Sequence, residues 1–395
     1  MVEARLRPCQ QGTKPGDGVT QSPIKGLRIR NYGFDQQRCE RNVKVQLDGH
    51  GARLAPSGRG AKFFAHGGEI ATALQAFPHA PRPFIDLSTG INPHAYPMPD
   101  VPGAMFERLP QRQDTESLES VAAQTFGVAR PECLVAVPGT QALLQRLPEI
   151  VPCQTVGILG PTYTGHAEAW VNSGARVTQI EHVRDLHGFD VAVVVNPNNP
   201  DGRLVVYPDL HTLRQRNQHL VVDEAFMDFL PADASFATQA SAPGSNVIVL
   251  RSFGKAYGLA GVRLGFSVAA PETIAALRRS FGDWAISGPA QFIGTIALAD
   301  KAWRQDMAER LVVESQRLLL LLQTSGWTDA GGTTLFRLAR HSEASRWFEH
   351  LASQGILTRP FAENPTLLRF GLPKLETQWQ RLASALSTGA GHTFP

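Results

Sequence analysis

Short apolar runs, each followed by a polar turn, recur through the middle of the chain and constrain its fold more than any other feature. Helical patterns separate five such runs, at residues 134–137, 156–159, 177–180, 191–195 and 220–222. Near-continuous apolar strands between helices are typical of a mostly parallel sheet that is covered on both faces. The sequence therefore predicts an α/β fold built on such a sheet, with a large domain over residues 115–300.

The last quarter of the chain indicates a second, smaller unit. Residues 302–324 are predicted to form one long helix that leads away from the sheet, and residues 333–386 have the pattern strand, helix, strand, helix. We therefore expect a small α+β domain over residues 301–395, joined by an N-terminal segment, residues 61–114.

The first 60 residues differ in composition from the rest. Residues 1–60 are rich in Gly, Gln, Arg and Pro and lack a sustained periodicity. Such a composition is typical of a poorly ordered extension, in which residues 43–47 are the one candidate strand.

Composition and charge exclude several functional classes. The net charge is only +3, and the arginines are spread along the chain, so nothing favours a nucleic-acid partner. The four cysteines form no C-x-x-C pair and have no histidines at metal-binding spacing, which favours reduced thiols and no metal site. No secretory signal is evident, and the most apolar run, residues 318–322, is too short to span a membrane. We expect a cytoplasmic enzyme without a membrane partner.

One lysine stands apart in a glycine-rich segment. Residues 252–265 have the sequence SFGKAYGLAGVRLG, and Lys255 is the only lysine strictly between positions 62 and 301. Ser252 lies three residues before it and Arg263 eight residues after it. A lysine in this setting can form a Schiff base with an aldehyde cofactor, and the hydroxyl and guanidinium can hold the phosphate of that cofactor.

Polar residues also follow the other predicted strands, at the sheet edge where open α/β folds bind ligands. Gly139 and Thr140 open a helix whose unpaired amides make an anion site. Tyr163, Asn199 and Asp223 follow later strands. A tyrosine ring can stack on a planar cofactor, an amide can donate to a phenolate oxygen, and a carboxylate can pair with a protonated pyridine nitrogen. Each residue alone is also compatible with an ordinary turn.

Taken in order, these features resemble the fold-type I, class I/II aminotransferase superfamily of pyridoxal 5'-phosphate enzymes, from about residue 63 to the C-terminus. The resemblance implies that Lys255 carries the cofactor and that Asp223 faces its pyridine nitrogen. It also implies that Asn199 donates to the ring hydroxyl and that Tyr163 stacks on the ring. The cofactor phosphate is then assigned to Gly139, Thr140, Ser252 and Arg263.

Three positions depart from patterns common among aminotransferases. Asp201 stands where many relatives carry Thr, and Phe226 stands where many carry Tyr. Leu109 stands where histidinol-phosphate aminotransferases commonly carry a tyrosine that reaches the site of the partner subunit. These departures weaken the interpretation as a general aminotransferase.

Other segments are similar to the threonine-phosphate decarboxylase family of cobalamin biosynthesis. They are HGGEI at residues 66–70, IDLSTGINP at 85–93, PGTQ at 138–141, NPNNPDGR at 196–203 and LRFGLP at 368–373. This resemblance implies decarboxylation of L-threonine O-3-phosphate to (R)-1-amino-2-propanol O-2-phosphate, by a homodimer. The residues alone do not reveal which substrate bond is cleaved, so two alternatives stay open: a histidinol-phosphate-type aminotransferase and a non-catalytic ligand-binding module on this fold.

A phosphorylated amino acid needs two anion sites besides that of the cofactor. By the superfamily resemblance, Arg369 takes the substrate α-carboxylate in a bidentate pair. The candidates for the substrate phosphate, from their positions relative to the motifs, are His66, the amides of residues 67–68, Asn92 and Arg359. Arg203 could also serve, although a solvated surface role is at least as expected for it. For His66, a structural role in a turn is equally expected.

Overall fold

A computed structural model describes residues 45–47 and 66–390, which belong to one compact unit, Lys44–Pro395. Strand β1 (Val45–Leu47) lies within the range in which the sequence predicts a strand. The rest of the expected N-terminal extension lies outside the described residues. No helix in the described ranges is long and apolar enough to cross a membrane.

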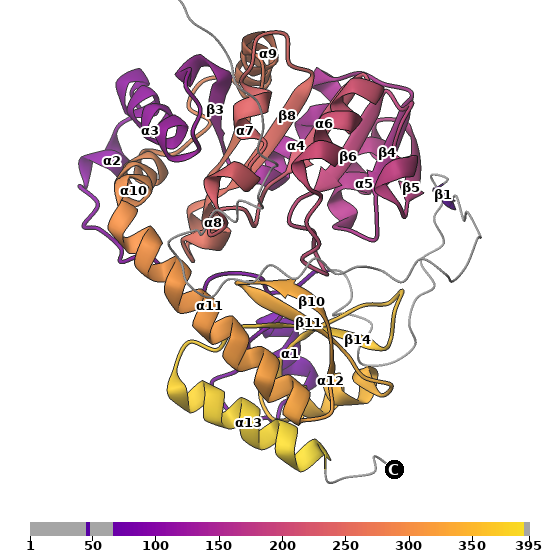
Figure 1. The fold of residues 1–395 in the computed structure, drawn as a ribbon. Helices are drawn as coiled ribbons and strands as arrows, with labels where there is room; N and C mark the ends of the chain where they lie inside the picture. The colour runs from indigo at the N-terminus through magenta and orange to yellow at the C-terminus, as the bar shows by residue number, and fades with distance from the viewer. Residues whose placement is uncertain (1–44, 48–65, 391–395) are drawn as a thin grey trace, which may run out of the picture. The chain divides into compact units, whose positions relative to one another are not determined.

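An eight-stranded sheet forms the centre of the larger layer (Figure 1). Its strands follow the order β1-β5-β4-β6-β7-β8-β9-β3. Besides β1 they are β3 (Leu134–Val137), β4 (Thr155–Leu159), β5 (Arg176–Ile180), β6 (Val191–Val195), β7 (His219–Asp223), β8 (Val247–Ser252) and β9 (Gly265–Val268). The five strands from β5 to β8 in this order are parallel, whereas β1 and β9 run antiparallel to their neighbours. The mostly parallel sheet predicted from the sequence is therefore confirmed.

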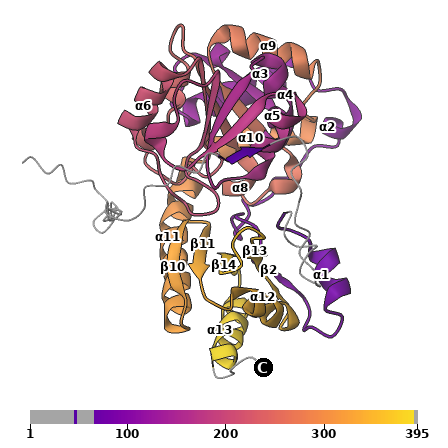
Figure 2. The same cartoon turned by 90° about the vertical axis from the view of Figure 1, so that its right-hand side faces the viewer.

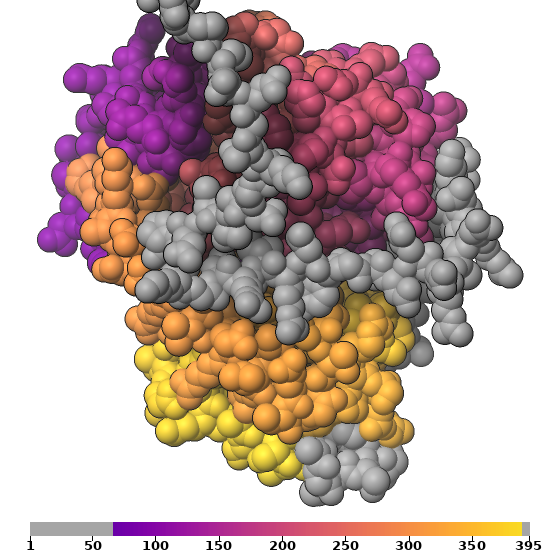
Figure 3. All heavy atoms as spheres, in the orientation of Figure 1, coloured from indigo at the N-terminus to yellow at the C-terminus, as the bar shows by residue number. Residues whose placement is uncertain are grey.

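Helices cover both faces of this sheet (Figures 1 and 2). They are α3 (Arg112–Thr125), α4 (Thr140–Ile150), α5 (Thr164–Asn172), α6 (Tyr207–Arg216), α7 (Ala237–Ala240), α8 (Phe253–Ala256), α9 (Pro271–Phe281) and α10 (Gly288–Ala299). Two short helices, α1 (Ile70–Ala76) and α2 (Ala104–Glu107), precede them. Helices α3 and α10 pack side by side: Gln291 on α10 donates to Thr115 on α3 at 2.8 Å. In Figure 3 the violet N-terminal residues accordingly adjoin the orange residues near position 300.

The apolar runs are continuous because both faces of each strand are buried. On β6, Ala192 and Val194 pack in one hydrophobic cluster, while Val191 and Val193 pack in another. Alternate residues of a strand point to opposite faces, so a strand between two helix layers needs apolar residues at every position. Polar residues are consequently concentrated at the ends of the strands.

The long helix α11 (Lys301–Thr324) leads from this layer to a second one (Figures 1 and 2). The second layer contains an antiparallel sheet in the order β10-β11-β14-β13. Its elements are β10 (Thr328–Thr333), β11 (Phe336–Arg340), α12 (Ala344–Ser353), β13 (Arg359–Pro360), β14 (Leu367–Gly371) and α13 (Glu376–Ala390). In addition β12 (Ile356–Leu357) pairs in parallel with β2 (Ile85–Asp86), so an N-terminal segment lies beside the C-terminal elements. The predicted domain boundaries stay a prediction.

Candidate active site

The carboxylate of Asp223 ends β7 and is only 5% exposed. Its Oδ2 lies 3.0 Å from Nε2 of His166, and its Oδ1 accepts from the Ala225 amide at 3.0 Å. Burial favours a raised pKa for Asp223, but the hydrogen bond and charge of His166, the charge of Lys255 and the Ala225 amide together lower the pKa below its ordinary value. Asp223 is thus a buried carboxylate held in its ionised form at the sheet edge.

His166 is a residue that the sequence reasoning missed. It lies on the first turn of α5 and is fully buried, and its Nδ1 has no hydrogen-bond partner among the described residues. The available signal was its spacing, because a residue three positions after Tyr163 on a helix that packs on the sheet lies near the same strand ends. A polar residue on that buried side needs a partner, and Asp223 provides it.

Tyr163 immediately precedes α5 and is half-buried. Its hydroxyl donates to Oε1 of Gln141 at 2.8 Å, and its ring centroid lies 6.3 Å from that of His166. The absence of a side chain at Gly165 allows this placement, since a Cβ there would lie 2.5 Å from the tyrosine ring. The predicted stacking residue therefore lies beside the Asp223–His166 pair.

Lys255 is half-buried on the short helix α8. Its Nζ lies 4.6 Å from the centre of the Phe226 ring. Burial lowers the pKa of Lys255, the charges of Arg369 and Arg263 lower it further, and the charge of Asp223 opposes this change. A lower pKa increases the fraction of neutral amine, which is the nucleophilic form.

Four residues predicted to hold a phosphate come together at the N-terminus of α4. Gly139 has φ +86°, and a Cβ there would lie 2.8 Å from Nη2 of Arg263, so that guanidinium lies directly over the glycine. A Cβ at Gly265 would lie 2.9 Å from the Thr140 amide nitrogen, and Gly265 is the register partner of Ser252. The structure therefore brings these four residues together at a helix N-terminus, where free amides favour an anion, and their binding of the cofactor phosphate stays a prediction.

The side chain of Arg369, on β14 of the second layer, contacts a residue of the first layer. Its Nη1 donates to Oδ1 of Asn199, and its Nη2 donates to the carbonyl oxygen of Ser88 at 2.8 Å. The guanidinium lies 4.9 Å from the centre of the Phe336 ring. The structure therefore joins a predicted substrate residue, Arg369, directly to a predicted cofactor residue, Asn199.

The guanidinium of Arg369 is buried, and among the described residues no carboxylate lies within ion-pair distance of it. It is 6% exposed, takes part in none of the ion pairs of the described residues, and its Nε has no partner among them. Burial and the charge of Arg359 lower its pKa to about 9 against the opposing charge of Asp86, which leaves it positively charged at neutral pH. A buried cation in this state favours an anionic ligand.

Arg359 stands beside Arg369 on the neighbouring strand. The two are register partners in the antiparallel pair β13–β14, so their side chains lie on the same face of the sheet. Burial lowers the pKa of Arg359, whereas the charges of Glu363 and Tyr163 act in the opposite sense. Arg359 and Arg369 thus place two positive charges on one side of the site, near Tyr163.

His66 and Asn92, the other candidates for the substrate phosphate, lie in different environments. The exposed His66 ring is 6.3 Å from that of Tyr163. Asn92 is buried; its Nδ2 donates to the Ala256 carbonyl at 2.8 Å and its Oδ1 accepts from the His94 amide at 2.9 Å. The structure thus places His66 near Tyr163, whereas Asn92 is hydrogen-bonded to α8, the helix of Lys255. Binding of either residue to the substrate stays a prediction.

The fold and these residues define a member of a known enzyme family. The sequence model of the family "Aminotransferase class I and II" matches residues 102–386, so the chain belongs to this family. Within it, the chain is 40% identical over 328 residues to threonine-phosphate decarboxylase from Pseudomonas aeruginosa, which covers 81% of the chain and 96% of the relative. A threonine-phosphate decarboxylase from Sinorhizobium sp is 39% identical, over 82% of the chain and 97% of the relative.

Solved structures agree on the fold. Histidinol-phosphate aminotransferase from Sinorhizobium meliloti, in complex with pyridoxal-5'-phosphate, matches with a TM-score of 0.70 at 20% identity and covers 81% of this chain and 94% of that chain. At this level of identity, the match supports the architecture of the two layers and no finer conclusion.

Proposed function

We propose that the chain is a pyridoxal 5'-phosphate-dependent lyase that converts L-threonine O-3-phosphate to (R)-1-amino-2-propanol O-2-phosphate and carbon dioxide. The observation that carries this proposal is the pair Arg359 and Arg369 on adjacent strands. The charge of Arg369 acts on Lys255, and the charge of Arg359 acts on Arg369. A substrate with a carboxylate and a phosphate needs two such cations. The relatives at 40% and 39% identity, both threonine-phosphate decarboxylases, support the same substrate.

The residues present fit the cofactor. The space between Gly139 and the Arg263 guanidinium fits a phosphate, and a Cβ on the glycine would occupy that space. Lys255 offers an amine of lowered pKa to an aldehyde. Asp223, buried and ionised, offers a counter-charge to a pyridine nitrogen. When bound, the cofactor supplies an electron sink for the electron pair left at the substrate α-carbon.

The side chains of this chain then have distinct roles. Asp223, oriented by His166, holds a proton on the pyridine nitrogen. Asn199 uses its Nδ2 group to donate to the ring hydroxyl, because its Oδ1 already accepts from Arg369. Lys255 would hold the cofactor through its amine, and the same amine would deliver a proton to the substrate α-carbon.

The substrate is oriented by its two anionic groups. Arg369 binds the α-carboxylate through its planar guanidinium, and Arg359 together with His66 binds the phosphate, with Asn92 supporting from behind α8. Following the family resemblance, we propose that the enzyme works as a cytoplasmic homodimer without a nucleic-acid or membrane partner.

A comparison of two substrates tests the reaction. The purified protein is incubated with L-threonine O-3-phosphate and no keto acid while carbon dioxide is measured, and separately with histidinol phosphate and 2-oxoglutarate while glutamate is measured. We expect carbon dioxide in the first assay and little glutamate in the second. L-threonine should react poorly, because an empty phosphate subsite withholds its binding energy from the transition state.

The two alternatives predict different results. Glutamate without carbon dioxide would replace the decarboxylase by an aminotransferase. A protein that binds a phosphorylated amino acid but turns over neither substrate would support the non-catalytic module.

A further inference from the structure

A short stretch of chain, the connecting segment (residues 92–96), lies between the lysine helix α8 and the long helix α11. Three hydrogen bonds join it to α8 and to the residue that follows this helix: Asn92 N to Lys255 O at 2.9 Å, Asn92 Nδ2 to Ala256 O at 2.8 Å, and Tyr96 N to Tyr257 O at 2.8 Å. Gly258 makes close packing possible, because a Cβ there would lie 2.7 Å from the Asn92 carbonyl oxygen. The backbone around Lys255 is therefore held by this segment.

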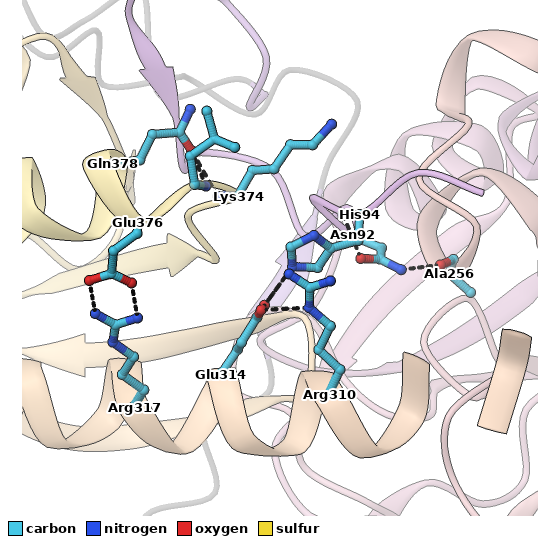
Figure 4. A network of polar contacts seen from close by, with 10 residues as sticks. Asn92, His94, Ala256, Arg310, Glu314, Arg317, Lys374, Glu376 and Gln378 are labelled. Atoms are coloured by element: carbon cyan, nitrogen blue, oxygen red, sulfur yellow. Dashed lines mark hydrogen bonds and ion pairs between the residues drawn. The ribbon is translucent and has the colours of Figure 1, made fainter. Parts of the chain in front are cut away.

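His94 joins the middle of the connecting segment to α11. Its Nε2 lies 2.9 and 2.8 Å from the two carboxylate oxygens of Glu314, and Glu314 also accepts from Nε of Arg310 at 2.9 Å (Figure 4). The histidine is 8% exposed. Its backbone amide donates to Oδ1 of Asn92, so the residue that contacts α11 also orients the residue that contacts α8.

The chain just before the connecting segment contacts the substrate arginine. The Ser88 carbonyl accepts from Nη2 of Arg369 at 2.8 Å, and the Leu87 carbonyl accepts from the Gly371 amide at 2.7 Å. One continuous stretch thus contacts Arg369 at its start and the Lys255 helix at its end. The separation of these two side chains depends on how this stretch is held.

We propose that His94 is a positioning residue: through Glu314 it fixes the connecting segment and thereby the place of Lys255 relative to Arg369. The inference rests on the proposed role of Lys255. Its physical basis is that a misplacement of about 1 Å can lower a rate on the order of 100-fold. His94 takes no part in the chemistry itself, because its ring contacts α11.

Removal of the His94–Glu314 contact should lower the catalytic rate strongly and weaken substrate binding only slightly. We expect His94→Ala and Glu314→Ala each to lower kcat by about 10- to 100-fold, with a much smaller change in KM. Glu314→Gln keeps an acceptor for the histidine and should recover most of the rate. The double variant His94→Ala/Glu314→Ala should be no slower than either single variant, because both remove the same contact.

A second readout does not depend on the loaded enzyme. In the cofactor-free protein, hydrogen exchange at the Asn92 and Tyr96 amides reports directly on the bonds to α8. We expect faster exchange at both amides in His94→Ala and Glu314→Ala, and near wild-type exchange in Glu314→Gln.

Arg317→Ala is the matched control. Arg317 lies on the same helix and donates two hydrogen bonds to Glu376, at 2.6 and 2.7 Å, which join α11 to α13 instead of to the connecting segment (Figure 4). This variant should change neither kcat nor the two amide exchange rates. Equal behaviour of His94→Ala and Arg317→Ala, or unchanged exchange in the His94 and Glu314 variants, would overturn the inference. Separately, borohydride reduction that fixes no cofactor on Lys255 of the wild type would contradict the proposed function.

Discussion

At the residue scale, neighbouring charged groups of the site shift one another's pKa values. The ionised carboxylate of Asp223 is stabilised by His166 and Lys255, while burial of Lys255 favours its neutral amine. A buried carboxylate is costly unless it is hydrogen-bonded, so the presence of His166 explains how an ionised aspartate persists behind the sheet edge. The charge at Asp223, more than its shape, is what the proposed chemistry requires.

Asp223→Asn tests this requirement. The amide keeps the shape: its oxygen can still accept from the Ala225 amide, and its NH2 group can donate to Nε2 of the other His166 tautomer. The protein should therefore fold and retain its cofactor, as measured by visible absorbance. Turnover should fall by several orders of magnitude, since each tenfold loss needs only about 1.4 kcal/mol of transition-state stabilisation.

The control is Asp190→Asn. Asp190 also has a lowered pKa, caused by the backbone amides of Gln154 and Thr155, but it precedes β6 at the opposite end of the strands. Its replacement should lower stability without affecting turnover. Near-normal turnover in a cofactor-bound Asp223→Asn variant would show that Asp223 does not face the pyridine nitrogen.

At the element scale, local sequence predicts much of the secondary structure. Residues 156–159 and 302–324 are predicted as a strand and a helix, and the structure has β4 at Thr155–Leu159 and α11 at Lys301–Thr324. The apolar pattern of residues 118–126 predicts a helix, but α3 spans Arg112–Thr125, because its exposed first turn is polar and carries no apolar signal. Burial makes the central strands easy to recognise, and solvent exposure hides the ends of the helices.

The helix α4 provides a test at this scale. Gly139→Ala should lower the affinity for pyridoxal 5'-phosphate by about 10- to 100-fold, because a Cβ 2.8 Å from Nη2 would displace the Arg263 guanidinium from the anion site. Cofactor affinity is measured by titration of the cofactor-free protein. The helix itself should stay intact by circular dichroism.

Gly139→Ala has two effects, displacement of the Arg263 guanidinium and strain in the backbone, and Gly174→Ala is a control for the second effect. Gly174 has φ +90°, close to the +86° of Gly139, but a Cβ there would meet nothing within 4 Å. Both variants place an alanine at a positive φ; at Gly139, where ψ is 151°, the backbone region is open essentially to glycine alone and the cost is on the order of 1–3 kcal/mol. If the control lost cofactor affinity to the same extent, backbone strain and not Arg263 would explain the result.

At the scale of the whole molecule, the site depends on contacts between residues far apart in sequence. Asn199 and Arg369 are 170 positions apart, and β2 pairs with β12 across 271 positions, from Ile85 to Ile356. Motifs identify the residue types at each strand end, but no local pattern says which ends meet. This is why the sequence leads to Lys255 and Asp223 as predicted site residues, whereas it gives no sign of the His94–Glu314 contact or the Asp223–His166 pair.

The arginine that joins the two layers supports the last prediction. Arg369→Ala should raise KM for L-threonine O-3-phosphate on the order of 100-fold or more, because a buried, charge-assisted contact with the α-carboxylate is lost. Arg369→Lys should be intermediate, since it keeps the charge without the planar fork. The cofactor band should persist in both variants, because the phosphate site at Gly139 and Arg263 belongs to the other layer.

Arg340→Ala is the matched control for this experiment. Arg340 lies on β11 of the same sheet but is exposed, and it donates to Oγ1 of Thr366 at 2.9 Å, away from the site. It should leave KM and the cofactor band unchanged. An unchanged KM in Arg369→Ala would remove Arg369 from the substrate site. Loss of the cofactor band together with binding would instead show that Arg369 acts on the cofactor through Asn199, because that hydrogen bond is the direct contact between the two.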